Sequence, residues 1–210
     1  MYTLHYSPGS ASLVIHWLLI ELGVEHQLIQ VDLENREHKA PDYLALNPNG
    51  VVPTLMVDGV PLAECAALTL LLAERHPQAG LEPARGTRER GWYLQWALHL
   101  ANTLQPAFRI WFYPSEAAGE EHGDAAKVLA RERIEGVYDR LDQHLSAHGP
   151  HVCGEQLTAV DFLATMLMRW SRNMPKPADR WPALAALAAR MKARPSFKLL
   201  YAREGLTEWA

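Results

Sequence analysis

The sequence has few cysteines and no long hydrophobic run. Among its 210 residues only Cys65 and Cys153 are cysteines, and they lie too far apart for a CxxC pair or a disulfide framework. No apolar run reaches the roughly 20 residues that a membrane-spanning helix needs. These absences exclude a disulfide-stapled scaffold and a helical membrane protein, and they favour two unpaired thiols in a reducing compartment.

The sequence also has no excess of positive charge. It carries 20 Lys and Arg residues against 24 Asp and Glu residues, with a formal net charge of -4, and the basic residues form no dense cluster. We therefore expect no nucleic-acid surface. The opening "MYTLHY" lacks the charged and apolar regions of a signal peptide, so we expect a cytoplasmic protein. His144 and His148 are four residues apart, but no carboxylate pattern accompanies them, and we predict no metal site.

The first third of the chain alternates between strand and helix patterns. A short strand is predicted over residues 2–6, an apolar helix over 12–22 ending at Gly23, and a second strand over 26–33. Further on, Asp58-Gly59 separates two short apolar runs, which is a strong hairpin signal, and an apolar helix follows over 65–76. This order predicts an α/β domain with one mixed sheet over residues 1–80.

The rest of the sequence is helical in pattern. The segment "HPQAGLEPARG" is rich in Pro, Gly and Ala and is the predicted linker. Helical patterns follow over residues 87–108, 124–148, 159–171 and 181–195, before a short tail. They predict an all-α domain over residues 87–210, built as a bundle of about five helices.

Two segments of the first domain resemble soluble glutathione S-transferases of the bacterial cytosolic type. "NPNGVVPTL", residues 47–55, resembles the family segment that leads to a cis-proline, here Pro53. A cis bond there would expose the backbone of Val52 to a peptide ligand. "LAEC" resembles the family's Glu-Ser at a helix start, where Glu64 would pair with the ammonium of glutathione and the helix start at Cys65 with its α-carboxylate.

A third segment, "GEQLTAVDFLA", resembles the capping segment of the family's helical domain, with Thr158 and Asp161 as the reciprocal cap. The resemblance covers essentially the whole chain. It implies a thioredoxin-like βαβ-ββα domain that binds glutathione as co-substrate, followed by a helical domain that contributes the electrophile pocket. It also implies a two-fold homodimer that conjugates glutathione to small hydrophobic electrophiles in detoxification.

The turn in "HYSPGSASLVIHW" is the predicted thiol site. Pro8 and Gly9 end the strand, and hydroxyl and N–H groups converge at the start of the next helix, where a bound thiol is favoured as thiolate. The candidate donors, in order, are Ser10, Ser12 and Tyr6. Helix capping is the alternative role for Ser12, and packing beneath the turn is the alternative for Tyr6.

Other candidates follow from the resemblance. His38 and Lys39 offer charge for the glycine carboxylate of glutathione, although a solvated connection explains them equally well. Aromatic and methionine side chains could line the electrophile pocket, although helical spacing also fits a core; they are Phe108, Trp111, Tyr113, Met166 and Trp170. We expect Trp111 or Tyr113 to face the pocket.

The sequence departs from the family pattern at three positions. Ala11 stands where a bacterial type has cysteine, Cys65 where serine is usual, and Gln105 where that bacterial type tends to have histidine. These departures keep a non-catalytic glutathione-binding or regulatory protein open as an alternative. A glutathione-dependent isomerase of a maleyl-type acid is the other alternative, and Arg109 is its one obvious basic candidate.

Overall fold

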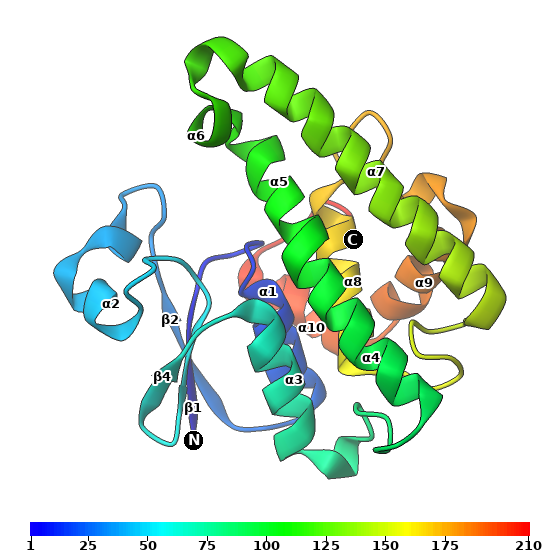
Figure 1. The fold of residues 1–210 in the computed structure, drawn as a ribbon. Helices are drawn as coiled ribbons and strands as arrows, with labels where there is room; N and C mark the ends of the chain where they lie inside the picture. The colour runs from blue at the N-terminus through cyan, green and yellow to red at the C-terminus, as the bar shows by residue number, and fades with distance from the viewer. The chain divides into compact units, whose positions relative to one another are not determined.

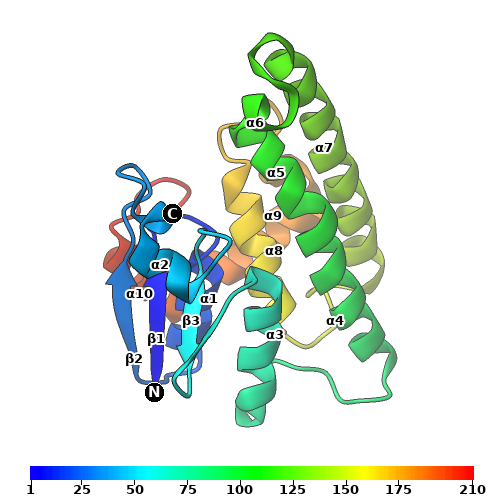
Figure 2. The ribbon, with the colours of Figure 1, turned by 60° about the vertical axis from the view of Figure 1, so that its left-hand side comes forward.

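In the computed structural model, which describes residues 1–210, the strands form one mixed sheet (Figure 1). Its order is β2 (His26–Gln30), β1 (Tyr2–Tyr6), β3 (Thr54–Val57) and β4 (Val60–Leu62), and Figure 2 shows β2, β1 and β3 side by side. β1 pairs in parallel with β2 and antiparallel with β3, and β3 turns at Asp58-Gly59 into β4. The predicted α/β sheet and its hairpin are confirmed.

Four helices accompany this sheet. They are α1 (Leu13–Glu21), α2 (Pro41–Leu46), α3 (Cys65–Arg75) and α10 (Pro195–Glu204). α1 packs against both α3 and α10 (Figure 1), and its residues from Leu13 to Leu19 are all buried. An apolar helix without a polar face is explained by this position, since it is covered from several sides.

The chain divides into two compact units. The first comprises Met1–Gly80 and Lys192–Ala210, and the second comprises Leu81–Met191. The sequence predicted a second domain that runs to residue 210, whereas the last residues here pack with the first unit. The reason is α10, an unpredicted helix that covers α1. None of the helices combines the length and apolar character needed to cross a membrane.

The second unit is helical. It contains α4 (Arg88–His99), a π-helical segment (Leu100–Leu104), α5 (Gln105–Phe112), α6 (Pro114–Ala118), α7 (Gly123–His148), α8 (Ala159–Trp170) and all but the last residue of α9 (Pro182–Lys192). α7 runs antiparallel to α4 and α5 (Figure 1). The helix predicted over residues 87–108 is interrupted by the wider π turn just before Pro106, which cannot donate a backbone hydrogen bond.

The predicted capping box at the start of α8 is present. Asp161 is fully buried, and its Oδ2 accepts from the backbone N–H of Thr158 at 2.8 Å. Its Oδ1 accepts from the N–H of Val152 at 2.8 Å. This carboxylate therefore fixes both the first turn of α8 and the loop that leads to it.

Candidate functional site

The turn between β1 and α1 carries the candidate hydroxyl groups. Gly9 has a φ of 69°, a left-handed conformation that glycine adopts without a side-chain penalty. The N–H of Ser10 then donates to the Ser7 carbonyl at 3.2 Å, and the N–H of Leu13 donates to the Ser10 carbonyl at 3.1 Å. The chain thus passes directly from strand to helix and places Ser10, Ala11 and Ser12 at the helix start.

Three serines of this turn form one hydrogen-bond network. The Ser10 hydroxyl donates to the Ser7 carbonyl at 2.7 Å, and the Oγ atoms of Ser10 and Ser12 are 2.8 Å apart. The backbone N–H of Ser12 donates to Ser10 Oγ at 3.2 Å, and that of Ser7 donates to Ser12 Oγ at 3.1 Å. Both side-chain oxygens are therefore held by backbone donors.

Exposure separates the two hydroxyl candidates. Ser12 has 0% of its surface exposed, whereas Ser10 is half-buried. Ser12 stands at the N-cap position of α1, but its side chain makes no bond to the first turn of the helix. The Ser12 hydroxyl therefore does not cap the helix. Of the two serines, only Ser10 is accessible to a ligand.

Tyr6, the third candidate, is a packed side chain. Its ring lies edge-on to His16, with centroids 5.7 Å apart, and no hydrogen bond joins its hydroxyl to the serine turn. Burial, and after it the charge of Glu204, raises the pKa of the Tyr6 phenol. The phenol stays protonated, and the geometry favours the packing role.

The backbone around Pro53 lies next to the serine turn. The Val52–Pro53 bond is cis, as the sequence predicted. β3 pairs Thr54 with His5, so continuing this antiparallel register sets Pro53 beside Tyr6 at the end of β1. The N–H and C=O of Val52 have no partner within the chain, which leaves one donor and one acceptor for an extended ligand.

The loop before Val52 is tied down by side chains from the preceding helices. The Val51 carbonyl accepts from the Tyr43 hydroxyl and from Asn47 Nδ2, each at 2.8 Å. Lys39 Nζ donates to the Gly50 carbonyl at 2.8 Å. Lys39 lies with the half-buried His38 in a 3-10 turn (Glu37–Lys39), and the contact it makes in the structure is with this loop.

The start of α3 reaches the same turn. The Cys65 thiol donates to the carbonyl of Ala11 at 3.5 Å. Its burial, and after it the charge of Glu64, raises the pKa of this thiol to about 12, so Cys65 is a protonated contact residue. Glu64, just before α3, is exposed and has a φ of 72°. Strained backbone of this kind concentrates at ligand sites.

A residue beside the serine turn that the sequence did not reveal is Glu204 of α10. Its Oε2 accepts from the N–H of Gly9 at 2.8 Å, and its Oε1 lies 2.7 Å from His16 Nδ1. Both side chains are fully buried. Glu204 thereby anchors the serine turn from 195 positions away in the chain, a distance at which no local sequence signal exists.

The predicted pocket residues of the second unit differ in environment. Phe108 and Met166 are buried core residues, and the Phe108 ring packs edge-on against Trp170 with centroids 5.7 Å apart. Lys127 Nζ lies over the Trp111 ring, 4.8 Å from its centroid, and Tyr113 is 50% exposed. For Phe108 and Met166 the structure thus shows the core alternative.

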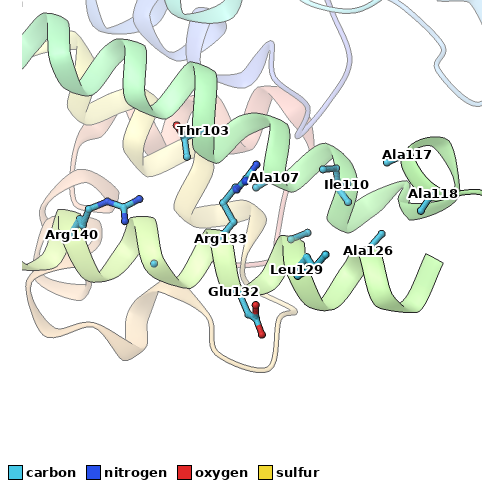
Figure 3. Close-up of a pocket in the computed structure, with 12 residues that line it drawn as sticks. Thr103, Ala107, Ile110, Ala117, Ala118, Ala126, Leu129, Glu132, Arg133 and Arg140 are labelled. Atoms are coloured by element: carbon cyan, nitrogen blue, oxygen red, sulfur yellow. The ribbon is translucent and has the colours of Figure 1, made fainter. Parts of the chain in front are cut away.

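A pocket of about 640 Å³ lies in the second unit and involves none of these residues (Figure 3). Arg133 and Arg140 extend from α7 toward Thr103 and Ala107, whereas Glu132 points away (Figure 3). The remaining lining is mostly small or apolar: Ile110, Ala117, Ala118, Ala126, Leu129, Ala130 and Gly136.

The site of the first unit thus combines a reachable hydroxyl, an unpaired peptide backbone and a carboxylate at a helix start. Family models for the N-terminal and C-terminal domains of glutathione S-transferase match residues 10–75 and 101–202. Glutathione S-transferase GstA of Escherichia coli O157:H7 is 30% identical over 206 residues, covering 97% of this chain and 98% of that protein.

A maleylacetoacetate isomerase of Rhizobium meliloti is 28% identical over 198 residues, covering 92% of each chain. The solved structure of a Sulfitobacter glutathione transferase homologue with bound glutathione superposes with a TM-score of 0.90 at 26% identity, covering 99% of each chain. The chain belongs to the glutathione S-transferase family. It is a glutathione transferase, and glutathione is its co-substrate.

Proposed function

We propose that the protein conjugates the thiolate of glutathione to small hydrophobic electrophiles, with Ser10 as the donor to the sulfur. The observation that carries this proposal is the half-buried Ser10 hydroxyl, held by the backbone N–H of Ser12 at 3.2 Å and placed at the start of α1. Hydroxyl and helix-start N–H groups favour the charged form of a thiol.

Each part of glutathione has a matching group in the first unit. The unpaired N–H and C=O of Val52 would pair with the peptide backbone. Glu64 would bind the ammonium, and the start of α3 at Cys65 the neighbouring α-carboxylate. Lys39, which has donors beyond those used on the loop, would bind the glycine carboxylate together with His38.

Catalysis would consist of thiolate stabilisation and proximity. The thiol proton leaves to solvent, Ser10 donates a hydrogen bond to the sulfur, and the thiolate attacks the electrophile. Lowering a thiol pKa by about two units corresponds to roughly 2.7 kcal/mol. A hydrogen bond to a charged group supplies about 1.5–3 kcal/mol, so one hydroxyl is sufficient in scale.

The rival reaction is isomerisation of a maleyl-type acid, which the similarity to the Rhizobium meliloti isomerase supports. Such an acid needs free basic side chains. Arg109 is engaged, since its Nε and Nη2 donate to the Glu116 carboxylate at 2.7 and 2.6 Å. This pairing favours conjugation as the main activity.

We also propose a homodimer in a reducing cytoplasm. Leu94 and Leu98 on α4, with Val128 and Leu129 on α7, are exposed apolar side chains, a composition that suits a partner surface. Both cysteines are unpaired, which fits the reducing compartment.

The test is the thiolate absorbance of the glutathione complex as a function of pH, combined with a conjugation assay. Ser10→Ala should raise the pKa of the bound thiol by about 1–2 and lower turnover at neutral pH roughly ten- to a hundredfold. Tyr6→Phe is the matched control and should titrate like the wild type. A wild-type titration for Ser10→Ala would overturn the assignment, and isomerase activity without conjugation would favour the rival reaction.

A further inference from the structure

We propose that Ser12 is a positioning residue that frees the Ser10 hydroxyl from the Ser7 carbonyl when a thiolate binds. This inference rests on the proposed function. It concerns how the donor becomes available, because the Ser10 hydroxyl donates to the Ser7 carbonyl at 2.7 Å.

Counting donors and acceptors in the turn shows the competition. The Ser7 carbonyl has two lone pairs, and one takes the backbone N–H of Ser10 at 3.2 Å. The other lies within reach of two hydroxyl donors, Ser10 Oγ at 2.7 Å and Ser12 Oγ at 3.1 Å. The Ser12 proton has a second acceptor in Ser10 Oγ, 2.8 Å away. Either hydroxyl, that of Ser10 or that of Ser12, can therefore donate to this lone pair of the Ser7 carbonyl.

Thiolate binding would use this exchange. When the Ser10 proton turns to the sulfur, the Ser12 proton takes the vacated lone pair of the Ser7 carbonyl. Ser10 Oγ keeps a donor, because the backbone N–H of Ser12 still reaches it at 3.2 Å. No group of the turn loses its last partner, and only two hydroxyl torsions change.

Because Ser12 is buried, its hydroxyl cannot contact the thiolate directly and can act only through its neighbours in the turn. Its side chain is completely buried, and the N–H of Ser7 fixes its oxygen at 3.1 Å. Ser12 acts on the thiolate through Ser10 and the Ser7 carbonyl. Without it, moving the Ser10 proton would leave a lone pair of a part-buried carbonyl unfilled, which disfavours the thiolate state.

The experiment compares glutathione with S-methylglutathione, which has no ionisable thiol. Ser12→Ala should raise the pKa of bound glutathione by roughly 0.5–1, the equivalent of one neutral hydrogen bond, and lower kcat at neutral pH by about three- to tenfold. Affinity for S-methylglutathione should stay within about twofold of the wild type. Ser146→Ala, at an exposed position on α7, is the control variant.

The double variant Ser10→Ala/Ser12→Ala tests whether Ser12 acts through Ser10. Its thiol pKa should equal that of Ser10→Ala alone, so that the two changes are non-additive. Additive changes, or equal loss of affinity for both ligands in Ser12→Ala, would overturn the inference and show a merely structural serine. If Ser10→Ala itself leaves the thiol pKa unchanged, the proposed donor is wrong. If only Ser12→Ala is silent, the inference alone fails.

Discussion

Glu64 combines an exposed carboxylate with a backbone conformation that few side chains adopt. Its φ of 72° and ψ of 104° lie outside the common regions, a departure that costs on the order of 1–3 kcal/mol. The side chain makes no capping hydrogen bond to α3. The strained backbone is therefore not offset by a side-chain hydrogen bond within the fold, which favours a role for the carboxylate in ligand binding.

Replacing Glu64 by Gln should weaken glutathione binding by about ten- to a hundredfold, because the charged partner of the ligand ammonium is lost. The melting temperature should not change, since the side chain of Glu64 makes no hydrogen bond to the helix start. Isothermal calorimetry measures the affinity. Glu74→Gln, exposed on the same helix, is the control, and unchanged affinity in Glu64→Gln would leave the residue as a solvated charge.

Cys65 makes stability depend on pH in the alkaline range. Burial raises the pKa of its thiol to about 12, whereas an unfolded thiol titrates near 8.5. Above about pH 8.5 the unfolded chain loses a proton that the folded chain keeps, so stability falls as the pH rises toward 12. Between pH 8 and pH 10 this thiol should cost about 1–2 kcal/mol.

Urea unfolding of wild type and Cys65→Ala at these two pH values measures the effect. The wild type should lose more stability than the variant over this interval, whatever their difference at pH 8. Cys153→Ala should behave similarly, since burial also raises the pKa of Cys153 to about 12. Parallel losses in wild type and both variants would contradict the burial argument.

At the scale of elements, α10 is a helix that the sequence analysis did not predict. It begins at Pro195, and its buried Phe197, Leu200 and Tyr201 have helical spacing, so a helix forms where we expected only a short tail. α2 spans six residues, too few for a periodic pattern. By contrast β1, the hairpin and α7 were predictable because each carries its own local signal.

The residues of the candidate site also fall into those that local motifs predict and those that only the tertiary packing brings together. Ser10, Val52, Pro53 and Glu64 stand in short motifs whose chemistry can be recognised from neighbouring residues. The contact of Glu204 with Gly9 joins opposite ends of the chain, and only the packing of α10 on α1 brings them together. The ranking of Ser10 above Ser12 was predictable from the position of Ser10 directly after Pro8-Gly9, and the complete burial of Ser12 supports it.

Replacing Glu204 by Gln should loosen the serine turn. The charged acceptor of the Gly9 N–H and the partner of His16 are both changed, and a hydrogen bond to a charged group contributes about 1.5–3 kcal/mol. We expect a lower melting temperature and faster amide hydrogen exchange at Gly9. Glu25→Gln, an exposed change in the same unit, should leave both unchanged. Equal rates of amide hydrogen exchange at Gly9 in both variants would show that Glu204 does not anchor the turn.

At the scale of the whole molecule, the serine turn, the cis-proline loop and the start of α3 all belong to the first unit. The second unit carries exposed apolar side chains on α4 and α7, with Leu98 at 54% and Leu129 at 66% exposure. If glutathione binds to these three segments as proposed, the exposed apolar side chains of α4 and α7 are not needed for that site and can serve assembly.

Light scattering at micromolar concentration should therefore give a mass of about twice the 23.6 kDa of the chain. Burial of apolar surface between copies is the physical reason. Leu98→Glu combined with Leu129→Glu should lower the measured mass if α4 and α7 form the contact. A wild-type mass of 23.6 kDa would exclude the dimer.

The contact between Glu204 and Gly9 also has a consequence in time. Ribosomes add about 5–20 residues per second, so the 195 positions between the two residues separate their synthesis by roughly 10–40 s. Throughout that interval the nascent chain holds the serine turn but not the carboxylate that receives its Gly9 amide. The segment that carries the proposed donor hydroxyl is among the first to leave the ribosome and among the last to acquire its final shape.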